Sequence, residues 1–175
     1  ELEAALAEAF RDAGVPWEVA FVQRWGSVLR PQDERARFDA LARRDTAAAT
    51  RQATRLTGGE QMVSLARLAL RANAPNAAAV LAEVPAARRG DPLLVYEHAA
   101  WLRRAGQDGA ALAQWLAAPA APVPPAWQPA LWRERDVLAR QLLQAGNASG
   151  AYKLAAAHGQ AGGEARLDAE FLAGF

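Results

Sequence analysis

Four short turns recur along this chain, and each one joins a longer helical pattern to a shorter one. The turns are centred on Arg44, Asn73, Gly106 and Gly146, at intervals of 29, 33 and 40 residues. Small residues, alanine or glycine, stand four and five positions after every turn. Self-similarity at this spacing is typical of arrays of helical hairpins, in which each unit buries its apolar stripe against its neighbours.

The composition points to the same fold class. Alanine supplies about a quarter of the 175 residues and isoleucine is absent. Good helix formers are therefore abundant, while strand-forming side chains are few. A chain of this length can bury one sizeable core. The sequence predicts an all-α fold of stacked helical hairpins that form a superhelical, TPR-like solenoid, as a single domain over residues 1–175.

Apolar periodicity places eleven helices, and one segment between them is irregular. The expected helices are 2–13, 16–29, 32–43, 46–56, 60–72, 76–83, 92–105, 108–117, 130–145, 148–158 and 164–174. The irregular segment, Pro119–Pro129, holds five of the ten prolines, a density that excludes a helix and favours an extended connection. We expect a long loop with Trp127 packed onto the array. A proline-rich ligand of the PxxP kind, recognised by a partner, is the alternative.

The turn residues have a direct physical explanation. Gly106 and Gly146 follow a helix end, where glycine readily adopts the left-handed conformation that closes the helix. Asp108 and Asn147 stand where a side-chain oxygen can cap the next helix. Pro75 suits the first position of its helix, because the missing N–H has no intrahelical partner there.

The apolar stripe is clearest in the last hairpin. Leu138, Leu142 and Ala145 share one face, and Tyr152 is expected to return toward them from the second helix. The final helix carries a broad apolar set, namely Leu167, Phe171, Leu172 and Phe175. We expect Phe171 to be buried near Tyr152, and Phe175 to be exposed, frayed or covered by another molecule.

Charge and metal chemistry exclude several functions. Twenty basic and nineteen acidic residues give a net charge of +1, which does not indicate a nucleic-acid surface. Nineteen of the basic residues are arginine, a bias that either reflects a GC-rich genome or suits bidentate pairing with carboxylates or phosphates. There is no cysteine, and His98 and His158 are isolated, so a zinc site is not expected.

Catalytic patterns are also missing. None of the three serines lies in a nucleophile-elbow pattern, and the paired glycines resemble neither a P-loop nor a dinucleotide fingerprint. Asp168 and Glu170 face different directions on one helix, as solvated or capping acids would. No run approaches ~18 apolar residues, so no transmembrane segment is expected. We expect no catalytic, cofactor-binding or metal-binding residue in this chain.

The tryptophans allow two interpretations. Trp101 and Trp115 fall at apolar positions of paired helices, which favours a role in the core. Trp127 and Trp132 flank the proline segment and are expected to be the more exposed. A sugar-stacking platform is the alternative for the whole set, which is Trp17, Trp25, Trp101, Trp115, Trp127 and Trp132.

In the stretch from Trp132 to Phe175, the hairpin ARQLLQAGNASGAYKLAAAHG is followed by DAEFLAGF. This stretch resembles the late part of the superhelical domain of soluble lytic murein transglycosylases, whose members carry DAEFLAGW. Residues 29–52 and 93–118 resemble earlier family segments more loosely. Arg44-Asp45 stands where relatives more often carry Trp-Ala-Gly-Asp, a departure confined to one turn.

The resemblance implies a periplasmic lyase that cleaves peptidoglycan between N-acetylmuramic acid and N-acetylglucosamine, with a 1,6-anhydro product. The family's catalytic glutamate lies in a Glu-Ser motif of a lysozyme-like domain downstream, and no glutamate here precedes a serine. We therefore expect a fragment: a non-catalytic scaffold whose partners are its own downstream catalytic domain and peptidoglycan glycan strands. No cofactor and no nucleic acid is expected. A TPR-like protein–protein adaptor is the alternative.

Arginine doublets recur near helix ends, and two roles are open to them. Murein carries lactyl and peptide carboxylates, which a cationic edge of the superhelix would attract. The simpler role, which we favour, is stabilisation of helix dipoles by cations at C-termini. The doublets are Arg43-Arg44, Arg88-Arg89 and Arg103-Arg104.

Overall fold

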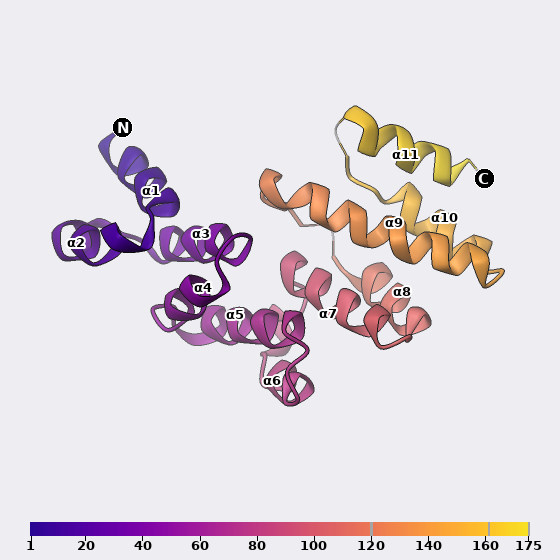
Figure 1. Cartoon of the computed structure of the whole chain (residues 1–175), viewed down its shortest axis with the longest axis horizontal. Coiled ribbons are helices and arrows are strands. Elements are labelled where there is room, and N and C mark those ends of the chain that lie inside the picture. Colours follow the sequence, from indigo (N-terminus) through magenta and orange to yellow (C-terminus); the bar gives the residue numbers. More distant parts are fainter. Residues whose placement is uncertain (120, 161, 175) are drawn as a thin grey trace. The chain divides into compact units, whose positions relative to one another are not determined.

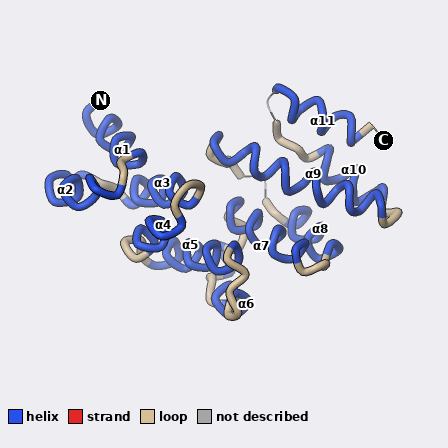
Figure 2. The backbone as a smooth tube through the Cα atoms, viewed as in Figure 1, coloured by secondary structure: helices blue, strands red, loops and turns tan. Residues whose placement is uncertain are grey.

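The computed structural model describes residues 1–119, 121–160 and 162–174, without the side chain of Val15. Over these residues the protein is 76% helical and contains no strand, with eleven α-helices and three short 3-10 helices (Figures 1 and 2). The all-α prediction is confirmed. The chain forms two compact units, Glu1–Pro85 and Ala86–Phe175.

The first unit is built on α3. Its helix α1 packs chiefly on α3, and α3–α4 and α5–α6 are helical hairpins. Phe10, Phe38 and Leu70 are fully buried at its centre. The helices are α1 (Leu2–Asp12), α2 (Val15–Trp25), α3 (Pro31–Ala42), α4 (Thr46–Ala53), α5 (Gly58–Arg71) and α6 (Ala77–Ala82), with a 3-10 turn at Gly26–Val28.

The second unit contains two stacked hairpins, α7–α8 and α9–α10. Helix α8 contacts both helices of the second hairpin, and α11 lies against α10 and α9. Leu93, Leu94, Leu138 and Leu154 fill its core. The helices are α7 (Pro92–Arg104), α8 (Asp108–Ala117), α9 (Gln128–Gln144), α10 (Ala148–Ala156) and α11 (Gly163–Ala173), with 3-10 turns at Ala86–Arg88 and Pro125–Trp127.

Three of the four recurring turns have the same backbone structure. Asn73, Gly106 and Gly146 have positive φ angles of 49°, 72° and 81°. In each turn the next N–H donates to the carbonyl five positions earlier, at 2.7 to 3.0 Å, which is the Schellman closure of a helix. The turn at Arg44 differs, because Asp45 N–H donates to the carbonyl only four positions earlier.

The small residues after these turns lie where helices meet. At least one of each pair is buried, including Ala48, Ala77, Ala111 and Gly150. A β-carbon built on Gly150 would lie 2.8 Å from Leu112 Cδ2 of the preceding hairpin. These small residues therefore allow the paired helices to approach closely.

Several local predictions need correction. Asn147 caps its helix by accepting from Gly150 N–H at 2.9 Å, but Asp108 is the first residue of α8 and caps nothing. Pro75 lies in the turn before α6, whose N-cap is Asn76. The proline segment ends earlier than expected, because α9 begins at Gln128 and holds Pro129 in its first turn, where proline is tolerated.

The predicted stripe of the last hairpin is partly right. Leu138 and Leu142 are buried, at 0% and 4% exposure. Ala145 is exposed, and Tyr152 is 57% exposed. Helix α10 instead packs through Gly150, Ala151, Leu154 and Ala155. The glycine and the two alanines of this set bring the backbones so close that a tyrosine ring does not fit between them.

Candidate functional site

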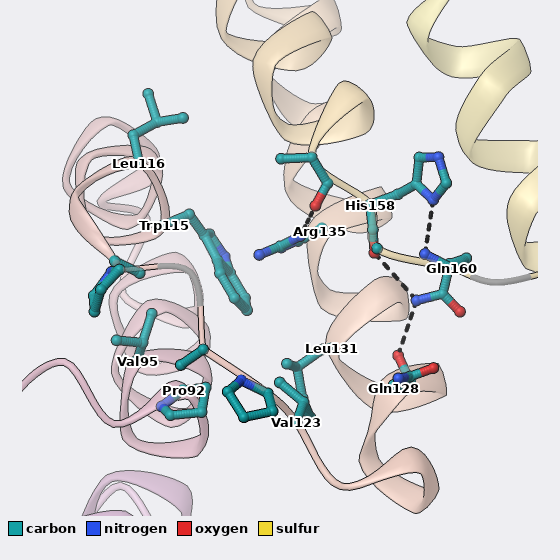
Figure 3. A pocket seen from close by; sticks show the side chains of 16 residues that line it. Pro92, Val95, Trp115, Leu116, Val123, Gln128, Leu131, Arg135, His158 and Gln160 are labelled. Atoms are coloured by element: carbon teal, nitrogen blue, oxygen red, sulfur yellow. Dashed lines mark hydrogen bonds between the residues drawn. The ribbon is translucent and has the colours of Figure 1, made fainter.

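A pocket of about 510 Å³ lies within the second unit. One wall comes from α7 and α8 and another from α9, while the proline segment and the turn after α10 complete it (Figure 3). The lining is mainly apolar, with one arginine and no acidic residue. Its members are Pro92, Val95, Trp115, Leu116, Ala118, Pro119, Ala121, Pro122, Val123, Gln128, Leu131, Arg135, Ala157, His158, Gly159 and Gln160.

Arg135 of α9 is the charged group of this lining. Its guanidinium carbon lies 4.4 Å from the ring centroid of Trp115, a cation–π distance. Its Nη1 donates to the carbonyl of Ala157 at the end of α10. Its Nε is buried without a hydrogen-bond partner. Burial lowers the pKa of Arg135 from its ordinary value, because the charged form loses water.

The turn after α10 is held by a small hydrogen-bond network (Figure 3). Gln160 N–H donates to Nδ1 of His158 at 2.8 Å. Gln160 Nε2 donates to the carbonyls of Gln128 at 3.4 Å and His158 at 3.3 Å. Nδ1 of His158 is therefore the acceptor that fixes the backbone of Gln160. The network places Ala157 beside Arg135.

The proline segment forms the floor of the pocket. Gly90 approaches it so closely that a β-carbon there would lie 2.9 Å from Pro119 Cγ. Pro119 and Pro122, which belong to the predicted PxxP pattern, are both in the lining. Trp127 ends the segment and packs edge-on to Tyr96 at a centroid distance of 6.0 Å. The expected packing of Trp127 onto the helices is confirmed.

The prediction that Trp127 and Trp132 are the more exposed tryptophans is wrong. They are only 3% and 6% exposed, since the 3-10 turn and the early start of α9 bring both rings inward. Trp115 is buried as predicted, at 6%, and Trp101 is half-buried. Trp17 is the most exposed tryptophan, at 72%.

The arginine bias has a structural use that the sequence pattern did not reveal. Arg37 is fully buried, and its Nη2 lies 3.1 Å from Glu18 Oε2. Arg67, also buried, pairs with Asp39. Such partners lie 19 and 28 residues apart in sequence, so no local spacing could identify them. Charge pairs of this kind join α3 to α2 and α5.

Two of the arginine doublets each contribute one residue to a contact between helices. Arg103 on α7 forms a two-point contact with Glu134 on α9, with Nη2 3.0 Å from Oε2. Arg44 donates to the carbonyl of Arg11 at 3.3 Å. Each of these two guanidinium groups therefore bonds to another helix, in addition to any effect on the dipole of its own helix. Arg103 in particular joins two helices of the second unit.

The C-terminal helix contradicts the prediction for Phe171. Phe171 is 65% exposed and Leu167 is 67% exposed, while Ala169 and Leu172 are buried. The helix is rotated so that a narrower stripe of small and medium side chains meets α10. The expectation for Phe175 concerns a residue outside the described part of the chain.

The remaining candidate groups form no ligand cluster. Glu170 pairs with Arg166 at 2.7 Å on the surface of α11, and Asp168 is exposed. Within residues 1–119, 121–160 and 162–174, no three His, Asp or Glu side chains are grouped to hold a metal. No helix of the described residues is long and apolar enough to cross a membrane. Comparison with known protein families, characterised proteins and solved structures finds no match to this chain.

Proposed function

We propose that this chain is a non-catalytic helical scaffold, the superhelical domain of a periplasmic peptidoglycan lytic transglycosylase. In this proposal the stacked hairpins continue as a TPR-like solenoid, provide a docking surface for a catalytic domain, and guide murein glycan strands. The observation that carries the proposal is the repeated Schellman turn of α7–α8 and α9–α10, at Gly106 and Gly146. The second of these hairpins is the stretch that resembles the family most closely.

The buried acids support a scaffold rather than an active site. Glycosidic bond cleavage uses a carboxyl group that is free to exchange a proton with the substrate. Three of the four buried acids in the part of the chain that the structure describes, Asp33, Asp39 and Glu134, are bonded to arginine. Such pairing engages the carboxylate oxygens and stabilises helix contacts.

The test uses purified sacculi and the 175-residue chain. We expect the chain to sediment with sacculi and to release no 1,6-anhydro-muropeptides, as measured by chromatography and mass spectrometry. Bovine serum albumin serves as the sedimentation control. Release of anhydro products above a buffer blank would refute the non-catalytic scaffold. Failure to sediment with sacculi would favour the adaptor alternative, a TPR-like module that binds a protein.

A further inference from the structure

We propose that the pocket of the second unit binds a small carboxylate with an apolar body, and that the guanidinium of Arg135 pairs with the carboxylate. The ligand class is the C-terminal carboxylate of a short apolar peptide or an N-acyl amino acid. Three properties of the pocket support this: the charge of its lining, the unpaired Nη2 donor of Arg135, and its apolar walls.

The charge of the lining is unbalanced. Arg135 has no carboxylate partner among the described residues, and the pocket contains no acid. The acids on either side of it in α9 are already engaged, Glu134 by Arg103 and Asp136 by Arg140 at 2.9 Å. The buried arginines of the first unit, by contrast, pair with carboxylates. Arg135 therefore differs from these buried arginines in having no carboxylate partner, and an anionic ligand in the pocket would be that partner.

One donor of Arg135 is left to bind a carboxylate. Nη1 donates to the carbonyl of Ala157, and Nε is buried away from the pocket space without a partner, so a ligand would accept from Nη2. A hydrogen bond between a guanidinium nitrogen and a carboxylate oxygen is charge-assisted and stronger than a neutral one. The indole Nε1 of Trp115, in the same lining, is also buried, so Trp115 offers the ligand its ring rather than its N–H.

The apolar walls of the pocket indicate the size and polarity of the rest of the ligand. Pro92, Val95, Val123 and Leu131 surround the space beside Trp115 (Figure 3). A volume of about 510 Å³ is within the range of small-molecule sites. A polyphosphate requires several cations, whereas this lining has one arginine. A neutral sugar would leave the guanidinium unpaired. A single carboxylate on a small apolar body satisfies both the charge and the walls.

The test is an NMR titration of the full chain with N-acetyl-alanyl-alanine. The matched probes are the C-terminal amide of the same dipeptide and inorganic phosphate. We expect the acid to bind and to shift the indole N–H signal of Trp115. The amide should bind at least about tenfold more weakly, because it cannot form the charge-assisted pair. Phosphate should bind more weakly than the acid, because it lacks the apolar body.

Three variants locate the binding. Arg135→Met should abolish the preference for the acid over the amide. Arg133→Met, an exposed arginine on the same helix, is the matched control and should leave binding unchanged. Val123→Trp fills the pocket from the proline segment and should block binding even if Arg135→Met does not fold.

Four outcomes would overturn the proposal. They are no binding of the acid, equal binding of acid and amide, undiminished binding by folded Val123→Trp, and stronger binding of phosphate than of the acid. The affinity of the pocket for a peptide acid is independent of peptidoglycan. A chain that fails to sediment with sacculi can still bind the dipeptide, so the two proposals fail separately.

Discussion

Arg37 is the side chain whose loss should most damage the first unit. It is fully buried on α3, and its guanidinium reaches the carbonyls of Phe10 and Ala13, the latter at 2.9 Å. It also pairs with Glu18 at 3.1 Å and lies 4.7 Å from the ring centroid of Phe10. One side chain therefore joins α3 to α1 and to α2.

Arg37→Met keeps most of the volume and removes every polar contact. Methionine fills the space, so the packing loss is small. Two backbone carbonyls lose their donor, at about 1–3 kcal/mol for each buried acceptor. Glu18 also loses its partner, and removing one member of a buried pair costs about 3–5 kcal/mol in total. The 14% exposure of the Glu18 side chain and the removal of the buried, unpartnered Nε of Arg37 both reduce this sum, so we expect a net cost of at least about 3 kcal/mol.

Urea unfolding, followed by circular dichroism, measures this cost, and hydrogen exchange locates it. Amide protection should fall first in α1 and α2, which Arg37 holds to α3. The control is Arg140→Met, which breaks an exposed i,i+4 pair with Asp136 and should cost at most about 1 kcal/mol. If the two variants lose the same stability, or if protection falls equally in both units, Arg37 does not anchor these helices.

Four further outcomes are expected. Leu142→Ala, at 4% exposure, should cost about 2–5 kcal/mol in urea unfolding; a cost below about 0.5 kcal/mol would place the residue on the surface. Gly150→Val should lower the free energy of unfolding by about 1–3 kcal/mol, because a β-carbon there would lie 2.8 Å from a side chain of α8. Gly109→Ala, in open space, should raise it by about 0.5–1 kcal/mol. If thermal melts show similar effects for the two variants, α8 and α10 do not approach closely at Gly150. Burial lowers the pKa of His98 below its ordinary 6.5, so the stability linked to it is present above that value and is lost as the pH falls through the lower folded pKa; an NMR titration midpoint at or above 6.5 would disagree. In α11, Leu172→Ala should reduce amide protection more than Phe171→Ala does, because Leu172 is 5% and Phe171 65% exposed; the reverse order would restore the original prediction.

The sequence was sufficient to predict the helices and most of their ends. Helix propensity, glycine closure and side-chain caps act within a few residues, so the Schellman turns at Gly106 and Gly146 and the cap at Asn147 could be read locally. Burial of Leu138 and Leu142 followed from the 3.6-residue period. The local rules were weakest where two of them competed, as at Pro129, which lies in the first turn of a helix rather than excluding one.

The sequence alone could not predict how helices rotate about their axes or which distant charges meet. Tyr152 and Phe171 belong to apolar patterns, yet both are exposed, because other side chains make the helix contacts: Gly150 and Ala151 on α10, and Ala169 and Leu172 on α11. The partners of Arg37 and Arg103 lie 19 and 31 residues away. Arg135 looks like any other helical arginine in the sequence. Only tertiary packing buries it against Trp115 without a carboxylate, because that outcome depends on three elements that meet in space and share no local spacing.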